Sequence, residues 1–304
     1  MIVVCGEALV DTSHFTDGTE RRTPGGGPFN TARALARLGI PTSFLGRLST
    51  DSAGRELGRL LSVDGVDLSR VSFGPEPTTV ARATVGKDGS AVYRFMTDGT
   101  SAPNLTSSML PPSLGADVTA IHVGSLGLVL EPMASTILEL LDRERGRHFV
   151  MVDPNVRPSA IRDPVAARAR IDAAIARSTI VKASEDDVAW LYPGLDLPTA
   201  AVQILAAGAR LAVITVGARG ALGITEGARV QVPAPAVEMV DTIGAGDAFG
   251  AALLAWLHEH EMLQRDLRIG PAELTSALAF ACQAASLTCT KAGAEAPLRA
   301  ELRP

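Results

Sequence analysis

Two carboxylates and two glycines lie close together near the carboxyl end of the sequence, in Asp241-Thr242-Ile243-Gly244-Ala245-Gly246-Asp247. The apolar residues that follow, from Ala248 to Leu254, predict a helix. Glycines just before a helix let consecutive backbone N–H groups point at one place, and the helix dipole adds positive potential there. Such a nest would stabilise a phosphoryl group in transfer, and Asp247 at its edge could accept a proton from an attacking hydroxyl.

Two other interpretations of this segment stay open on spacing alone. Asp247 could simply be a helix N-cap after a loop, which is a common arrangement. Gly244, Gly246 and Gly250 also match a loose dinucleotide-binding pattern, which would suit a dehydrogenase. That pattern usually follows the first strand of a fold, and nothing like it follows Val3–Val10, so the dehydrogenase is disfavoured.

A second group of polar residues lies near the amino terminus. The apolar run Ile2–Val10 predicts a strand that Asp11 ends, which places a carboxylate at a sheet edge, where open α/β folds bind ligands. The glycine-rich segment Pro24–Asn30 then precedes a helix predicted over Thr31–Leu38 and closed by Gly39. A carboxylate and an amide can hold vicinal hydroxyl groups, and glycines let the backbone approach a sugar ring. On this spacing alone, helix capping by the asparagine and a plain turn at the glycines are the simpler explanations.

The elements that must position these residues follow a strand-then-helix rhythm, which predicts a doubly wound, mostly parallel sheet flanked by helices. One stretch breaks the rhythm: the alternating runs Thr78–Val85 and Ser90–Met96 flank Gly86–Gly89 and predict a hairpin. We therefore expect a single domain over 1–304, with lid segments at about 12–23 and 72–100 forming a small β-sheet. Further strands are predicted at Thr42–Leu45, Thr119–Val123, His148–Val152, Thr179–Lys182 and Leu211–Val216, and further helices at Ala53–Leu61, Met133–Arg145, Val165–Ala176, Ala200–Ala207, Asp247–Glu259 and Ala272–Leu287.

Composition limits the function classes. The formal net charge of −5 and the absence of a basic run argue against a nucleic-acid partner. No apolar run reaches the roughly 18 residues needed to span a bilayer, and Met1–Val4 lacks the basic start of a signal peptide. Cys5, Cys282 and Cys289 form no CxxC pair and suit buried thiols in a reducing compartment. We expect a cytoplasmic protein that binds neither nucleic acid nor membrane.

Two segments together resemble one family. Asp241–Asp247 resembles the carboxy-terminal DTxGAGD signature of the ribokinase (PfkB) family of sugar kinases, and Gly25–Asn30, with Gly39 and Gly46, resembles its amino-terminal signature. The two lie more than 200 residues apart in the expected order, and the similarity runs nearly end to end. The resemblance implies a ribokinase-like α/β fold with a β-sheet lid over the sugar. It also implies an ATP-dependent kinase that transfers the γ-phosphoryl group to a sugar hydroxyl.

The resemblance also assigns residues to the sugar and to the reaction. Asp247 would be the catalytic base, and the amides of Gly244, Ala245 and Gly246 would form the anion hole. The segment Val152–Arg157 resembles a strand end that faces the phosphates or the sugar in the family. The sugar-binding residues implied in this way are Asp11, Gly26, Gly27, Asn30, Arg157 and Asp247.

The nucleotide and metal residues follow from the same resemblance. Thr215–Gly220 resembles a TxGxxG turn that lines the nucleotide, and Lys182–Asp187 stands where the family usually has NxxE near magnesium-bound waters. Here Ser184 and Asp187 replace the longer side chains of that motif. We expect Mg²⁺ held through water near Asp187 and, with the loop Thr288–Ala294, K⁺ at Asp241 and the Ile243 carbonyl. The implied ATP-binding residues are Lys182, Ser184, Thr215, Gly217, Gly220, Gly244, Gly246 and Gln283.

The sugar is the least constrained expectation. The amino-acid sequences of several segments most resemble those of bacterial fructokinases. This resemblance makes Arg82, Tyr93 and Phe95 on the lid candidate sugar contacts. A 2-keto-3-deoxygluconate kinase, whose substrate carboxylate would need an arginine such as Arg82 or Arg157, and a ribokinase are the alternatives. A sugar-sensing protein without catalysis is the alternative from another class, disfavoured by the intact Asp247. A homodimer formed through the lid is also expected.

Overall fold

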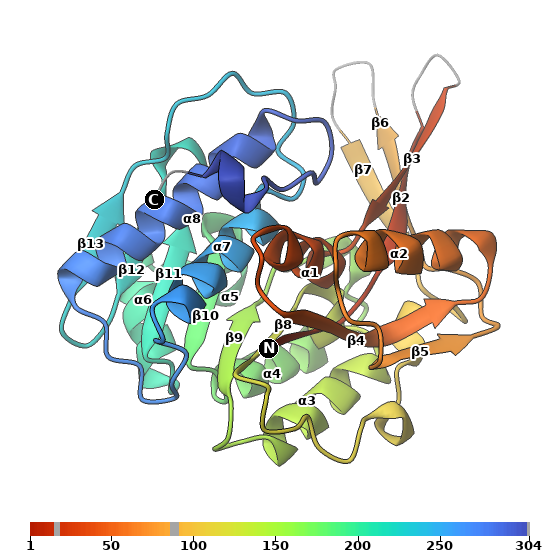
Figure 1. Cartoon of the computed structure of the whole chain (residues 1–304), viewed down its shortest axis with the longest axis horizontal. Helices are drawn as coiled ribbons and strands as arrows, with labels where there is room; N and C mark the ends of the chain where they lie inside the picture. The colour runs from red at the N-terminus through yellow and green to blue at the C-terminus, as the bar shows by residue number, and fades with distance from the viewer. Residues whose placement is uncertain (15–18, 86–90, 303–304) are drawn as a thin grey trace.

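The computed structural model describes residues 1–14, 19–85 and 91–302. Its centre is a nine-stranded sheet with the order β13-β12-β11-β10-β9-β8-β1-β4-β5 (Figure 1). The strands from β11 to β5 in this order run parallel, and β12 and β13 pair antiparallel at one edge. The strands are β1 Ile2–Cys5, β4 Thr42–Ser49, β5 Val71–Gly74, β8 Ala120–Gly124, β9 Phe149–Asp153, β10 Ile180–Ser184, β11 Leu211–Thr215, β12 Ala221–Ile224 and β13 Arg229–Val232.

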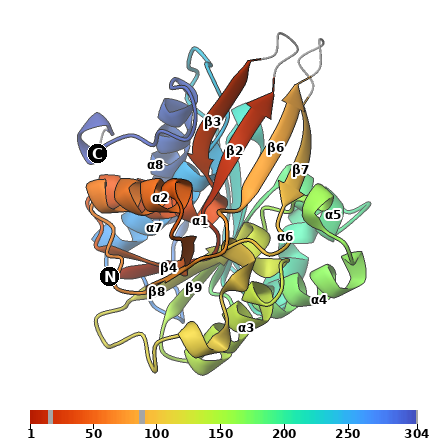
Figure 2. The same ribbon diagram turned by 90° about the vertical axis from the view of Figure 1, so that its right-hand side faces the viewer.

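Helices cover both faces of this sheet, as the view in Figure 2 shows, with α1, α2, α7 and α8 on one side and α3 to α6 on the other. Successive side chains of a strand point to opposite faces of the sheet, so each central strand contributes to two hydrophobic cores. In β1, Ile2 and Val4 join the first core, and Val3 and Cys5 join the second. The helices are α1 Gly27–Arg37, α2 Ser52–Val63, α3 Met133–Arg143, α4 Pro164–Ile175, α5 Glu185–Leu191, α6 Leu197–Ala206, α7 Ala245–Glu259 and α8 Pro271–Cys289.

A smaller four-stranded sheet, the lid sheet, stands on the large sheet (Figures 1 and 2). Its order is β3-β2-β6-β7, with β2 Leu9–His14, β3 Glu20–Gly25, β6 Val80–Val85 and β7 Ala91–Met96. The predicted hairpin pairs as expected, with β6 and β7 antiparallel from Val80 opposite Met96 to Val85 opposite Ala91. Its turn, 86–90, lies outside the described residues. β5 pairs with β4 in the large sheet, so residues 72–74 of the predicted lid segment belong to the main domain.

The first predicted strand is two strands in the structure. β1 ends at Cys5 and β2 begins at Leu9, so the chain leaves the large sheet and enters the lid sheet within four residues. Gly6 permits this change of direction: its φ is +152°, and a Cβ placed on it would lie 2.4 Å from Pro28 Cγ. The short link brings the base of the lid against the start of α1.

The carboxyl ends of the central parallel strands meet at one edge, next to the amino-terminal ends of α1 and α7. Open α/β sheets bind their ligands at such an edge. The three cysteines are free, Cys5 and Cys282 being buried. Among the described residues, no helix combines the length and apolar character that crossing a bilayer requires.

Candidate active site

Helix α1 carries the amino-terminal part of the site. It begins at Gly27, four residues before the predicted start, because Pro28 occupies the first turn, where its fixed φ suits a helix. Gly26 precedes the helix with φ +109°, and a Cβ on it would lie 2.9 Å from the Glu7 carbonyl oxygen. Asn30 is therefore inside the first turn and not a cap. Its Nδ2 donates a hydrogen bond of 2.8 Å to Asp247 Oδ2.

Helix α7 carries the carboxy-terminal part. Gly244 caps it with φ +77°, a conformation that favours glycine. We call residues 241–246 the anion loop. Of the three amides predicted to form the anion hole, that of Ala245 donates to the Thr242 carbonyl oxygen at 3.3 Å and closes the turn. Asp247 follows in the first turn of the helix, where it is buried and only 8% exposed.

The environment of Asp247 suits a general base. Burial raises the pKa of its carboxyl group, and the Asn30 hydrogen bond together with the charges of Lys182 and Arg157 opposes that rise. A raised pKa moves a carboxylate toward the value at which proton acceptance near neutral pH is efficient. A Cβ placed on Gly27 would lie 3.4 Å from Asp247 Oδ1, so the missing side chain leaves that oxygen approachable.

A buried ion pair lies beneath the anion loop. Lys182 Nζ of β10 donates to Asp153 Oδ2 of β9 at 2.8 Å, and the two side chains are 4% and 5% exposed. Burial, the largest single cause, lowers the pKa of Lys182, but the carboxylates of Asp153, Asp187 and Asp247 together outweigh it and the net shift is upward. A Cβ on Gly246 would lie 3.1 Å from Lys182 Nζ, so this cation is close to the anion loop. Lys182 can therefore neutralise negative charge there.

The carboxylates near this pair bear on the expected Mg²⁺. Asp153 Oδ1 is buried without a hydrogen-bond partner. Burial is the largest cause that raises the pKa of Asp153 to about 6, and the negative charges of Asp187 and Asp247 add to the rise. An unpartnered carboxylate oxygen among like charges fits a hydrated divalent cation. Asp187 lies in the first turn of α5 and completes a capping box with the N-cap residue Ser184: its oxygens accept from Val156 N at 2.6 Å and from Ser184 N and Oγ at 2.8 and 2.7 Å. The described residues contain no cluster of three metal-ligating side chains, so the ion would depend on water and phosphate oxygens.

Asp241 ties the anion loop to the loop that follows α8. Its Oδ1 accepts from the Ile243 amide at 3.1 Å, and its Oδ2 accepts from the Gly293 amide at 2.9 Å. Ala294 packs on Gly244, where a Cβ would lie 2.5 Å from the Ala294 Cβ. The residues predicted to hold a monovalent cation thus meet in one place, while the cation role itself stays a prediction.

On the sugar side, Asp11 lies at the base of the lid sheet in β2. A Cβ on Gly25 would lie 2.0 Å from Asp11 Oδ2, so a side chain at position 25 would displace this carboxylate. Burial raises the pKa of Asp11 to about 6; the charge of Arg157 lowers it, and that of Asp247 raises it. These mutual effects place the three predicted charged residues within electrostatic range of one another.

Glu7 is a site residue that the sequence analysis did not single out. It is 1% exposed, and its two carboxylate oxygens accept from the Gly27 amide at 3.3 Å and the Gly127 amide at 3.1 Å. It also bonds the side chain of Ser125, and burial raises its pKa to about 7. One carboxylate therefore joins the start of α1 to the 3-10 turn Ser125–Leu128 that follows β8. Its position two residues after a buried strand was the signal that could have revealed it.

The nucleotide candidates lie farther along the same edge. Thr215 ends β11, and its Oγ1 donates to the Ala183 carbonyl oxygen at 3.4 Å. Gly217 and Gly220 shape the turn that follows, and a Cβ on Gly220 would lie 1.9 Å from the Val232 carbonyl oxygen. Gln283 is half-buried on α8.

Among the lid candidates, Arg82 is exposed, and Phe95 is half-buried and packs against the second core. The side chain of Tyr93 lies outside the described residues.

This geometry agrees with comparisons to known proteins. Residues 1–301 match the model of the pfkB family of carbohydrate kinases. The chain belongs to this family. A fructokinase of Rhizobium leguminosarum bv. trifolii is 41% identical over 269 residues, which cover 87% of this chain and 82% of that protein. A fructokinase of Klebsiella pneumoniae is 31% identical over 305 residues, covering 99% and 98%.

Solved structures of two kinases superpose on 96% of the chain. A Vibrio cholerae O395 fructokinase double mutant with bound fructose, ADP and potassium ion has a TM-score of 0.85 at 28% identity, covering 96% of this chain and 93% of that one. An aminoimidazole riboside kinase of Salmonella enterica has a TM-score of 0.82 at 28% identity, covering 96% and 94%. The predicted ribokinase-like fold and the kinase class are thereby confirmed for this carbohydrate kinase.

Proposed function

We propose that this carbohydrate kinase transfers the γ-phosphoryl group of ATP to a hydroxyl of fructose, with Asp247 as the base. The observation that carries the proposal is the contact between the two signature segments: Asn30 of the first holds the buried carboxylate of Asp247 of the second. Identity of 41% with a bacterial fructokinase supports fructose as the sugar.

The reaction needs positioning and charge neutralisation more than covalent chemistry by the protein. A sugar hydroxyl placed against Asp247 Oδ1 would lose its proton to that oxygen, since Oδ2 is occupied by the Asn30 amide. Asp11 and the backbone at Gly26 and Gly27 would hold neighbouring hydroxyls. Lys182 and the amides at the start of α7 would stabilise the charge that develops on the transferred group.

Cations would complete the site. Mg²⁺ would supply Lewis-acid neutralisation of the phosphates, held through water near Asp153 and Asp187. The potassium ion of the Vibrio cholerae fructokinase structure supports a monovalent cation beside Asp241 and the Ile243 carbonyl. A cytoplasmic location, which suits three free cysteines, and a homodimer through the lid sheet belong to the same proposal.

The test is ADP release with Mg-ATP against a panel of fructose, ribose, 2-keto-3-deoxygluconate, adenosine and aminoimidazole riboside, with a sugar-free reaction to measure ATP hydrolysis alone. We expect fructose to give the highest kcat/KM. A higher value on the sugar acid would instead assign Arg82 or Arg157 to its carboxylate, and a higher value on a riboside would move the protein to that substrate class. Binding of ATP without turnover on any sugar would favour the sugar-sensing alternative.

A further inference from the structure

The loop that follows α8, residues 290–298, lies directly behind the anion loop, and we call it the C-terminal loop. The Gly293 amide donates to Asp241 Oδ2, and the Ala294 methyl group fills the space that a side chain on Gly244 would need. Gly244 begins α7, so a shift of Ala294 would move the first amides of that helix. The position of the anion loop therefore depends on the position of the C-terminal loop.

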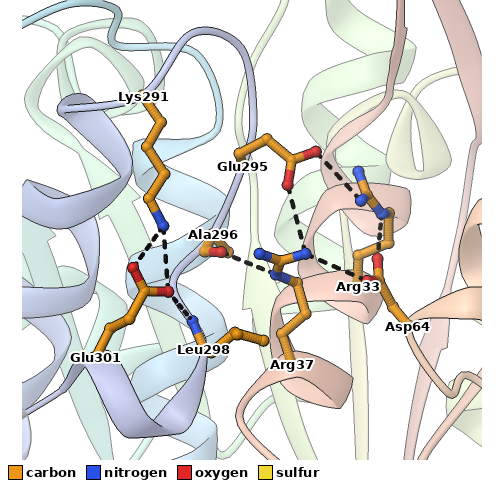
Figure 3. A network of polar contacts seen from close by, with 8 residues as sticks. All are labelled: Arg33, Arg37, Asp64, Lys291, Glu295, Ala296, Leu298 and Glu301. Atoms are coloured by element: carbon orange, nitrogen blue, oxygen red, sulfur yellow. Dashed lines mark hydrogen bonds and ion pairs between the residues drawn. The ribbon is translucent and has the colours of Figure 1, made fainter.

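Two arginines of α1 hold the other side of the C-terminal loop (Figure 3). Arg37 Nε donates to the Ala296 carbonyl oxygen at 2.8 Å, and Arg37 Nη1 lies 3.4 Å from Glu295 Oε2. Arg33 Nη2 donates to Glu295 Oε1 at 3.3 Å. We call Arg33, Arg37 and Glu295 the arginine clamp.

The arginine clamp is fixed in place by a second carboxylate. Asp64, at the end of α2, accepts from Arg33 Nε at 2.5 Å and from Arg37 Nη1 at 3.3 Å. The side chains of Arg33, Arg37 and Asp64 are 11%, 18% and 9% exposed, so these are not solvent-screened surface pairs. Two guanidinium groups and two carboxylates balance in charge, and solvent reaches mainly Glu295, which is 45% exposed. The rigid part of the clamp is thus on α1, and its link to the loop is Glu295.

Helix α1 also carries Asn30, one turn before Arg33, and Asn30 holds the catalytic carboxylate of Asp247. One rigid helix therefore contacts the base directly and the anion loop through the C-terminal loop. We propose that Arg33, Arg37 and Glu295 are positioning residues that set the anion loop for phosphate binding. This inference deepens the proposed function and rests on it.

A simpler role, anchoring the end of the chain, predicts a different result. Outside the C-terminal loop, another pair anchors the end of the chain: Arg299 Nε and Nη2 donate to the two carboxylate oxygens of Glu259, at the end of α7, at 3.0 and 3.2 Å. Neither residue belongs to α1 or to the C-terminal loop. If anchoring were all that mattered, loss of this pair and loss of the clamp would have similar effects on ATP binding. Glu259→Gln is therefore a matched control for Glu295→Gln.

The experiment compares Arg37→Met and Glu295→Gln with Glu259→Gln in the full-length protein. ATP affinity is measured by calorimetry, kcat and both KM values by ADP release, and backbone mobility by hydrogen–deuterium exchange over residues 241–249. We expect each clamp variant to weaken ATP binding by about five- to tenfold and to speed exchange of the anion loop, with the fructose KM changed less than about twofold. The control should match wild type in all of these.

Wild-type ATP affinity and exchange in both clamp variants would overturn the proposal, as would an equal effect in Glu259→Gln. If Arg37→Met fails to fold, Glu295→Gln decides alone, because its side chain is half exposed and its loss leaves the Arg33–Asp64 pair intact. Failure of the proposed function is separable: it would show as wild-type protein that binds ATP without phosphorylating fructose. Calorimetry and exchange require no turnover and would still test the clamp.

Discussion

The Asn30 side-chain amide donates a 2.8 Å hydrogen bond to Asp247 Oδ2 across 217 positions of sequence. Both residues are buried, at 7% and 8% exposure. The bond occupies one oxygen of the carboxylate and fixes its orientation, and in our proposal the other oxygen, Oδ1, accepts the substrate proton. The two family signatures are therefore one structural unit, in which the first segment positions the carboxylate that we propose as the catalytic base.

The first prediction concerns Asp247 itself. Asp247→Asn keeps the shape of the side chain but removes its ability to accept a proton, so we expect kcat to fall by about two to four orders of magnitude. Affinities for ATP and fructose, measured by calorimetry, should change only a few fold. Asp186→Asn, an exposed residue in the first turn of α5, is the matched control. Near-wild-type turnover of Asp247→Asn would remove Asp247 from the role of base.

The second prediction is a pH profile. Asp247 accepts a proton only when ionised, and burial raises its pKa above the ordinary 3.8, so kcat/KM should fall as pH drops through a value above 3.8. The Asn30 hydrogen bond lowers this pKa. Asn30→Leu removes the donor. The fall of kcat/KM on the acid side of the profile, the acid limb, should therefore occur at higher pH in the variant, even if its maximal kcat/KM also changes. A limb that stays in place in the variant would contradict the assignment of the limb to Asp247.

Much of the fold could be predicted because the parallel strands are continuous apolar runs, as in β8 and β9, and the helices have clear starts. The predictions were wrong where a close contact decides the local path. The first strand divides at Gly6 because Pro28 packs against it, and no local pattern records that contact. β3 has the sequence ERRTPG, which lacks an apolar alternation, and forms a strand only because β2 pairs with it.

The site was predictable where glycines and carboxylates are clustered in sequence, as around Asp247. It was not predictable where the signal is burial. Glu7 is an ordinary residue in the sequence, and its importance comes from two amides that approach it from distant segments. The ion-pair partner of Lys182 could not be predicted either. Asp153 lies on the neighbouring strand, and the pairing of β9 with β10 is a tertiary property.

The third prediction uses the buried Glu7. Burial raises its pKa from 4.5 to about 7, so the stability that it contributes is fully present below pH 4.5 and is lost as pH rises through about 7. Glu7→Gln does not titrate. The difference in unfolding free energy between variant and wild type should therefore move in favour of the variant between pH 4.5 and 7.5, by up to about 3 kcal/mol. Urea denaturation at the two pH values measures it. A constant difference would mean that Glu7 does not titrate in this range.

The fourth prediction separates the structural and chemical roles of Lys182. Lys182→Met leaves Asp153 buried without its partner, which should destabilise the fold by about 3–5 kcal/mol. Adding Asp153→Asn removes the unpaired charge and should restore most of that loss. Turnover should stay low in the double variant, because the cation near Gly246 is still absent. Recovery of both stability and turnover would show that Lys182 serves only to neutralise Asp153.

The fifth prediction tests the contact between Gly244 and Ala294. Gly244→Ala adds a Cβ that would lie 2.5 Å from the Ala294 Cβ, at a residue whose φ of +77° already disfavours a side chain. Relief of the clash must displace the anion loop, and a displacement of about 1 Å at a reacting centre can lower turnover on the order of 10²-fold. Adding Ala294→Gly removes the contact with the Ala294 Cβ, but the Cα of residue 294 still lies 2.8 Å from the added methyl group and the φ strain remains, so kcat should recover only in part. Gly227→Ala is the control, since nothing lies within 4 Å of its added methyl group. Equal turnover in Gly244→Ala and in the double variant would assign the effect to the φ strain and the remaining backbone contact, and the Ala294 methyl group would then have no part in setting the anion loop.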